Sequence, residues 1–124
     1  MDNKRPVNLD LTKFSFPLPA LTSIVHRVTG FALFVGLVFL MYSLDLSLES
    51  EQGFATVKEG LDHPLAKLII WGVVSALLYH LVAGVKHLVM DMGIGETLEG
   101  GRNGALIVIA VSVVLIVLAG VWIW

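Results

Sequence analysis

The sequence predicts an all-α membrane protein with three transmembrane helices. Hydrophobic residues make up 56% of the 124 residues and charged residues only 15%, which lies outside the range of ordinary soluble domains. A hydrocarbon core of about 30 Å requires roughly 20 apolar residues per helical span. Three windows meet this requirement, namely 20–44, 68–90 and 105–124. We therefore expect a single transmembrane domain over residues 1–124, with no room for a water-soluble catalytic domain.

Residues 1–19 precede the first window and are too polar to insert into a bilayer. Their mixed charge differs from the short basic region of a cleavable signal peptide, so we expect the first hydrophobic helix to stay in the membrane. Pro17 and Pro19 resist regular structure, and the second proline favours a helix start just before Ala20.

The first window opens with a polar patch at membrane depth, Ser23-Ile24-Val25-His26-Arg27-Val28-Thr29-Gly30. Ser23 and Arg27 are four residues apart and therefore share one helix face. Gly30 continues that side and permits the close approach of a neighbouring helix. The rest of the window is almost entirely apolar, as expected of a segment that contacts lipid or packs against other helices.

The connection after the first window, residues 45–67, is acidic. Within it, residues 51–61 favour a short interfacial helix. Pro64 is a suitable first residue for the second membrane helix, and Gly93 and Gly95 are expected to end that helix. The third window follows a short glycine-rich connection and carries no charge.

The distribution of basic residues predicts the orientation, because Lys and Arg are retained in cytoplasmic loops. Basic residues gather before or at the start of the first window and beside the second connection: Lys4, Arg5, Lys13, Arg27, Lys86 and Arg102. The first connection is acidic instead. We therefore expect the N-terminus and the second connection in the cytoplasm, and the C-terminus on the far side, with Trp122 and Trp124 as interfacial anchors.

The second window ends in a stretch that carries two imidazoles. His80, Gly84 and His87 fall on one helix face, because seven residues make nearly two turns. Ionisable side chains are costly at bilayer depth and usually mark a functional site. The chain contains no cysteine, which excludes thiolate metal sites and haem attached through Cys-x-x-Cys-His. Histidine is thus the metal ligand to consider.

Depth along the helices separates the histidines. At about 1.5 Å per residue, His26 lies roughly 9 Å below the cytoplasmic boundary and His87 roughly 5 Å, whereas His80 lies about 15 Å down. His26 and His87 are therefore expected to share a level. His80 is expected to have no histidine of this chain at its own level.

A haem held by two histidines needs one imidazole on each face of the porphyrin, at the same depth. If His80 binds haem, another chain must supply the opposite ligand. The propionates of that haem would need partners, and three side chains nearer the cytoplasmic surface are placed to provide them: His26, Arg27 and His87. Gly84, one turn from His80, would leave room for the flat macrocycle.

Each of these residues also has a purely structural interpretation. A single histidine in a membrane helix more often hydrogen-bonds a neighbouring helix than binds a metal, and this applies to His26 and His80. Arg27 can snorkel to the headgroups, and Ser23 can serve helix packing. The spacing of His80 with Gly84 and His87 is the feature that favours binding of a metal by His80.

Three blocks of residues resemble a known family: Arg5-Pro6-Val7-Asn8-Leu9-Asp10-Leu11, the block of residues 23–30, and HLVAGVKHLVMDMG of residues 80–93. Together they resemble the cytochrome b membrane subunit of bacterial succinate dehydrogenase (respiratory complex II). The resemblance extends over nearly the whole chain, including the number of spans and the order of the loops. The patterns SxxHRxTG and HxxxGxxH are specific in combination, although each alone is weak.

The resemblance implies a function within a larger complex. The chain would anchor a flavoprotein and an iron–sulfur protein to the cytoplasmic face of the bacterial inner membrane. Electrons from succinate would pass from flavin through the iron–sulfur clusters to ubiquinone. A second three-helix membrane subunit would complete a haem-binding helical bundle of which this chain is half. No independent catalysis and no nucleic-acid partner are implied, and membrane lipid surrounds the spans.

The resemblance also assigns site residues. The family's haem-ligand histidine falls on His80, which would share haem b with a histidine of the second subunit. The quinone-site serine and arginine fall on Ser23 and Arg27, and His26 and His87 match positions near the propionates. A hydroxyl donor and a fixed cation one turn apart suit a quinone, because negative charge develops on its carbonyl oxygens during reduction.

Two other functions fit the same features. A haem-free anchor or assembly protein would use the histidines only to hold helices together. The membrane anchor of a fumarate reductase would use a similar architecture with electrons flowing in the reverse direction. A spectrum of the purified complex distinguishes the haem-free alternative from a haem-binding subunit, because it shows directly whether a b-type haem is present.

Overall fold

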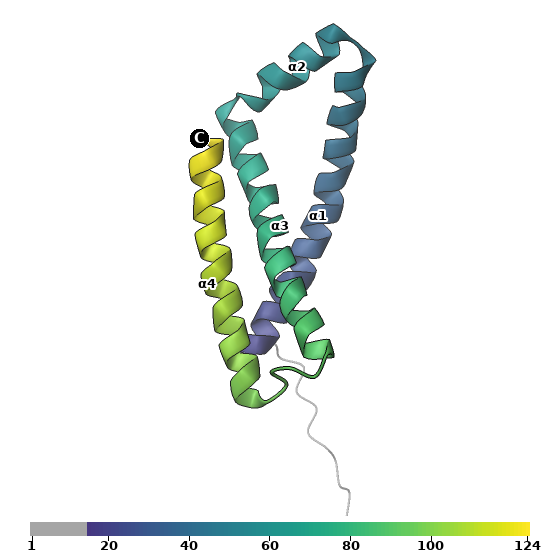
Figure 1. The fold of residues 1–124 in the computed structure, drawn as a ribbon. Coiled ribbons are helices and arrows are strands. Elements are labelled where there is room, and N and C mark those ends of the chain that lie inside the picture. The colour runs from purple at the N-terminus through teal and green to yellow at the C-terminus, as the bar shows by residue number, and fades with distance from the viewer. Residues whose placement is uncertain (1–14) are drawn as a thin grey trace, which may run out of the picture.

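The structure is a computed structural model that describes residues 15–124, and these residues form four α-helices and no strand (Figure 1). The helices are α1 (Leu18–Glu49), α2 (Glu51–Leu61), α3 (Pro64–Asp91) and α4 (Leu98–Ile123). Within the described residues, α1, α3 and α4 are long and apolar enough to cross a membrane, which confirms the three expected spans. The block Arg5–Leu11 and the basic residues Lys4, Arg5 and Lys13 lie outside the described residues.

The three long helices begin before their apolar windows, because helical structure continues into the polar residues that flank each window. Pro17 is the N-cap of α1 and Pro19 lies in its first turn, so α1 starts slightly earlier than expected. Pro64 is the first residue of α3, as predicted. His63 caps that helix, because its Nδ1 accepts a hydrogen bond from the backbone N–H of Leu65 at 3.2 Å.

Two connections join the three long helices. α2 matches the expected interfacial helix, and its N-cap Ser50 accepts a hydrogen bond from the backbone N–H of Gly53 at 2.9 Å. After α3, Gly93 and Gly95 adopt φ angles of +82° and +73°. This left-handed region favours glycine, and it turns the chain sharply back toward α4. The predicted end of the second span is thus confirmed.

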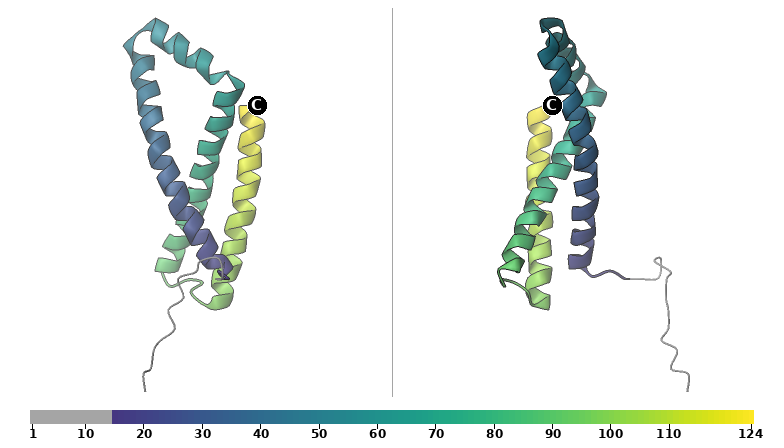
Figure 2. Two further views of the ribbon diagram at one scale, coloured as in Figure 1. Left: turned by 180° about the vertical axis from the view of Figure 1, so that it is seen from behind. Right: turned by 90° about the vertical axis from the view of Figure 1, so that its right-hand side faces the viewer.

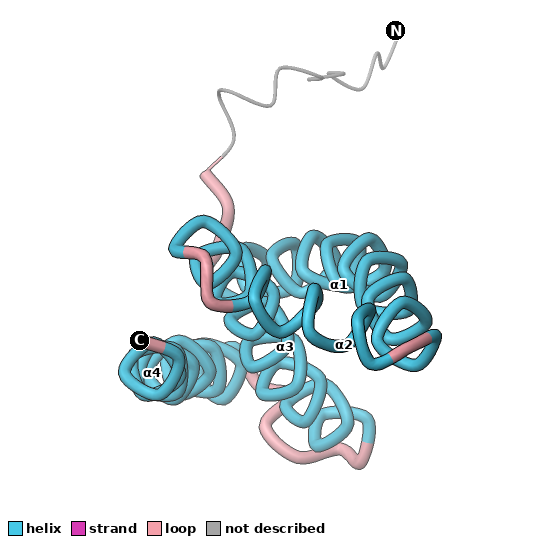
Figure 3. The backbone as a smooth tube through the Cα atoms, turned by 90° about the horizontal axis from the view of Figure 1, so that it is seen from above, coloured by secondary structure: helices cyan, strands magenta, loops and turns pink. Residues whose placement is uncertain are grey.

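The helices α1 and α3 form a narrow V that α2 closes at its wide end (Figures 1 and 2). They cross near the opposite end, and α4 runs alongside α3. Seen along the helices, α3 lies between α1 and α4 (Figure 3). The residues at the crossing of α1 and α3 are therefore held by helix packing on both sides of α3.

α4 packs through small residues. Its buried positions recur every three or four residues, and they are Gly101, Ala105, Val108 and Ser112. This spacing forms one helix face, and small side chains allow helices to approach closely in a membrane. Gly101 faces Pro19 of α1, and the stem of Lys86 from α3 passes along Gly104. Both neighbouring helices thus contact the same stripe of α4.

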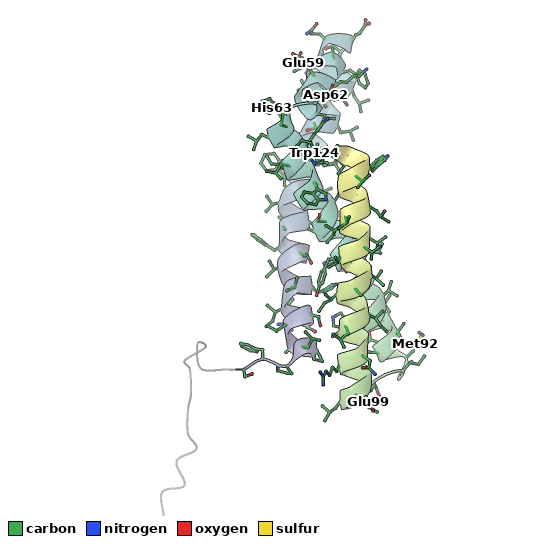
Figure 4. All side chains as sticks on the ribbon, turned by 90° about the vertical axis from the view of Figure 1, so that its left-hand side faces the viewer. Glu59, Asp62, His63, Met92, Glu99 and Trp124 are labelled. Atoms are coloured by element: carbon green, nitrogen blue, oxygen red, sulfur yellow. The ribbon has the colours of Figure 1, made fainter. Side chains whose placement is uncertain are left out.

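Trp71 joins the far ends of α3 and α4. Its indole Nε1 donates a hydrogen bond to the carbonyl oxygen of Ile116 at 2.9 Å. Gly120 makes room for the ring, because a Cβ there would lie 3.1 Å from it. The expected anchor Trp122 is 85% exposed. Trp124 lies at the same end of the molecule as His63, and Met92 lies at the opposite end (Figure 4).

Candidate functional site

Three histidines meet where α1 crosses α3. The imidazoles of His26 and His80 are stacked, with ring centroids 3.9 Å apart and planes inclined by 10°. The ring of His87 meets that of His26 edge-on, at a centroid distance of 5.2 Å and an angle of 61°. The structure therefore brings together the three membrane-depth histidines that the sequence analysis selected.

This cluster corrects the estimate of depth. His80 was expected to have no histidine of this chain at its own level, yet the ring of His26 lies directly against it. Counting residues along parallel helices ignores the angle at which the two helices cross (Figure 2). The crossing brings His26 within reach of both histidines of α3.

The Nδ1 atom of His80 faces two oxygen atoms of α1. It lies 3.0 Å from the carbonyl oxygen of His26 and 3.2 Å from the hydroxyl oxygen of Thr29. The hydroxyl of Thr29 also donates a hydrogen bond to that same carbonyl, at 2.8 Å. One nitrogen of the His80 ring is therefore engaged by α1, and Nε2 is the nitrogen left for a ligand.

Two glycines make this close approach possible. A Cβ on Gly30 would lie 3.0 Å from Cε1 of His80, a distance that a real Cβ atom rarely shows. The expectation that Gly30 permits a close neighbour is thus confirmed. Gly84 faces His26 from α3, and a Cβ there would lie 3.6 Å from Nε2 of that ring. A glycine on each helix thus borders the stacked rings.

The histidines line an open groove of about 600 Å³ along the α1–α3 pair. Its lining consists of His26, His80, Leu81, Gly84, Val85, His87 and Leu88. The shared presence of His80, Gly84 and His87 confirms that these three residues fall on one face of α3. The groove is walled by aliphatic side chains, of which Leu81 is 60% exposed and Leu88 64% exposed. This chain forms only one side of the space.

The residues of the groove suit a haem better than a bare metal ion. Among the described residues, no three His, Cys, Asp or Glu side chains are arranged to hold a metal ion. A haem iron already has four porphyrin nitrogens and needs only axial ligands, of which a histidine is the commonest. Apolar walls suit the macrocycle, and His26 and His87 provide polar groups at the edge of the groove. The donor set thus fits one face of a haem.

Ser23 and Arg27 lie one turn apart on α1, on either side of His26 in the sequence, and neither lines the histidine groove. Ser23 is half-buried and Arg27 is exposed. Within the part of the chain that the structure describes, neither side chain has a hydrogen bond or an ion pair, so the two are not hydrogen-bonded to each other. Both polar groups are available to a ligand from outside the chain.

Two further residues, which were not predicted from the sequence, support the cluster. Thr29 contacts His80 as described above, and Tyr79 donates a hydrogen bond from its hydroxyl to the carbonyl oxygen of Thr22 at 2.7 Å. Tyr79 directly precedes His80 in the sequence, and Thr29 follows His26 by three residues. Their roles require knowing which turns of α1 and α3 face each other, and helical periodicity alone does not give this.

The chain is similar in sequence to known proteins. The chain matches the sequence model of succinate dehydrogenase/fumarate reductase transmembrane subunits over residues 1–119. It is 48% identical to the succinate dehydrogenase cytochrome b556 subunit of Coxiella burnetii, covering 100% of both chains. It is 39% identical to that of Paracoccus denitrificans, covering 92% of this chain and 88% of the other. The mitochondrial cytochrome b560 subunit of Sus scrofa is 31% identical over 91% of this chain and 68% of its own.

Proposed function

The chain belongs to the succinate dehydrogenase/fumarate reductase transmembrane subunit family, and we propose that it binds haem b through His80 and helps to form a site of ubiquinone reduction. It is a membrane-anchor subunit similar to bacterial cytochrome b556 subunits. In this proposal, a second anchor subunit supplies the opposite haem ligand. The flavoprotein and iron–sulfur subunits deliver electrons from succinate on the cytoplasmic side of the inner membrane.

The observation that carries the haem proposal is the presentation of His80 in an apolar groove. An imidazole binds iron through an unprotonated nitrogen, and α1 engages Nδ1 of His80, which leaves Nε2 for that purpose. His26, His87 and the nearby Arg27 would pair with the propionates, and Gly84 would leave space for the porphyrin. When bound, haem would store one electron close to the quinone.

The open side of the groove supports a shared haem. Exposed leucines of α3 border it, and among the described residues the one α1 histidine that lines it, His26, is stacked on the ring of His80 and so cannot face His80 across a porphyrin. A haem held by two histidines would therefore take its second ligand from another subunit, which would also cover these leucines. In this proposal the chain forms half of a haem-binding bundle, as expected from its sequence.

The quinone proposal depends on the free polar groups of Ser23 and Arg27. Reduction places negative charge on the quinone carbonyl oxygens, and preorganised donors stabilise that charge most where water is excluded. The hydroxyl of Ser23 would donate to one carbonyl oxygen, and the guanidinium of Arg27 would hold a positive charge beside it. Their place near the start of α1, on the expected cytoplasmic side, gives the quinone access to protons and to a peripheral electron donor.

The test is a reduced-minus-oxidised spectrum of the purified complex. We expect a b-type signal from the wild-type complex, loss of that signal in His80→Ala, and retention of it in the control His63→Ala. His63 caps α3 at the far end and lies outside the cluster. Wild-type complex without a b-type signal would favour a haem-free anchor. A His80→Ala complex with an unchanged spectrum would refute the ligand assignment.

A further inference from the structure

We propose that Thr29 is a positioning residue for His80. Together with the main-chain carbonyl of His26, its hydroxyl holds the proton of His80 on Nδ1 and directs Nε2 into the groove. The inference rests on the proposed function, because it concerns the ligand of the proposed haem. It adds a residue that neither the spacing of the histidines nor the polar patch singled out.

The geometry distinguishes the two tautomers of His80. If Nδ1 carries the proton, it donates to the carbonyl oxygen of His26 at 3.0 Å and also faces the oxygen of Thr29 at 3.2 Å. If Nε2 carries the proton, the lone pair of Nδ1 faces the carbonyl oxygen at the same 3.0 Å. A carbonyl oxygen is only an acceptor, so the second arrangement sets two lone pairs against each other. The first tautomer is therefore the one that fits.

The hydroxyl of Thr29 completes this arrangement. It donates its own proton to the carbonyl oxygen of His26 at 2.8 Å, so its lone pairs remain free to accept from Nδ1 of His80. The carbonyl and the hydroxyl thus form two neighbouring acceptors for one N–H group. Because both oxygens belong to one turn of α1, they fix the rotation of the ring as well as its tautomer.

These contacts act on a metal through the imidazole. A ligating histidine commonly donates its other N–H group to a carbonyl or carboxylate oxygen, which orients the ring and raises its basicity. A more basic axial imidazole favours the ferric state of a haem. Loss of the Thr29 hydroxyl should therefore raise the midpoint potential of the haem and weaken its retention.

The experiment compares three substitutions in the purified complex. Thr29→Val keeps the shape of the side chain but removes the hydroxyl, and Thr29→Ser keeps the hydroxyl. The control Thr22→Val removes an equivalent hydroxyl, which donates to the carbonyl oxygen of Pro19 at 2.9 Å and does not contact His80. The haem midpoint potential and the rate of haem loss to an excess of a haem-scavenging apoprotein are measured for each complex.

We expect a raised potential in Thr29→Val and haem loss faster by roughly tenfold or more, which is the usual scale for such supporting contacts. Thr29→Ser and Thr22→Val should both resemble the wild type. Unchanged potential and haem loss in Thr29→Val would overturn this inference and leave the proposed function intact. A change that Thr29→Ser fails to restore would also overturn it. Wild-type complex without haem would overturn both proposals.

A second pair of variants tests the same contact if the Thr29→Val complex does not assemble. Gly30→Ala places a methyl group 3.0 Å from Cε1 of His80, whereas Gly36→Ala places one 3.2 Å from the side chain of Val73, farther along the same helix. We expect Gly30→Ala to turn the ring away from its acceptors and to shift the low-spin electron paramagnetic resonance signal of the haem. Equal signals in the two variants would contradict the inference.

Discussion

At the scale of single residues, the turn of α1 around His26 presents different groups to different surroundings. Successive side chains on a helix are 100° apart, so His26 turns toward α3 while its neighbour Arg27 remains exposed. Thr29 returns to the α3 side and contacts His80. In the proposed function, one short block of α1 thus supports the haem ligand His80 on one face and offers the cation of Arg27 to the quinone on another.

Arg27→Ala should lower quinone reduction by the complex, by about 100-fold if Arg27 acts as a preorganised donor to the developing charge. Succinate oxidation with a soluble artificial acceptor should stay at the wild-type rate, because that route bypasses the quinone site. Arg27→Lys should restore only part of the activity, since lysine keeps the charge but lacks the planar fork of arginine. Both rates are measured on purified complex.

Arg102→Ala is the matched control for this prediction, because Arg102 is an exposed arginine of α4 outside the histidine groove. It should leave both rates unchanged. Wild-type quinone reduction by the Arg27→Ala complex would contradict the assignment of Arg27 to the quinone site.

At the scale of helices, glycines decide how closely the elements approach each other. The closest of these contacts lies at the corner between α1 and α2. The backbone N–H of Gly53 donates to Ser50, which fixes the start of α2, and a Cβ on Gly53 would run into the main-chain carbonyl of Leu46. Gly60 lies in the same helix, where nothing lies within 4 Å of an added Cβ. One glycine is thus required by packing and the other is not.

Gly53→Ala should therefore destabilise the chain by about 1–3 kcal/mol, the usual effect of forcing extra atoms into a packed contact. Gly60→Ala should be neutral or stabilising by up to about 1 kcal/mol, because alanine favours helix over glycine. The thermal midpoints of the two purified complexes are compared. A thermal midpoint of the Gly53→Ala complex at or above that of the Gly60→Ala complex would contradict the close contact between Gly53 and the main chain of Leu46.

At the scale of the whole molecule, the helices bury little of their apolar surface against one another. Among the described residues, the fully buried hydrophobic side chains are only Ala83, Ala105 and Val108. Large side chains on the outer faces stay exposed, such as Phe31 at 72%. In water this would be unstable, whereas lipid chains and partner helices can cover these faces. The open histidine groove is part of the same exposed surface.

The orientation of the chain can be tested directly, because the sequence contains no cysteine. Glu96→Cys places a thiol in the connection between α3 and α4, and Gln52→Cys places one on α2. Both positions are exposed. With the N-terminus in the cytoplasm, a membrane-impermeant thiol reagent added to spheroplasts should label position 52 and spare position 96. Lysed membranes should label both, and the reverse pattern in spheroplasts would refute the positive-inside assignment.

The sequence determined the class of protein, the three spans, the short helix α2, the start of α3 at Pro64 and its end just before Gly93. These features follow from local rules, because hydrophobic length, proline and glycine act within a few residues of themselves. It also selected the histidines, because imidazoles at membrane depth stand out in an apolar chain. The tertiary structure decided which of them meet. The crossing of α1 and α3 set the stacking of His26 on His80 and the contact of Thr29 with His80. The angle between two helices depends on side-chain packing along their whole contact and not on the period of either one.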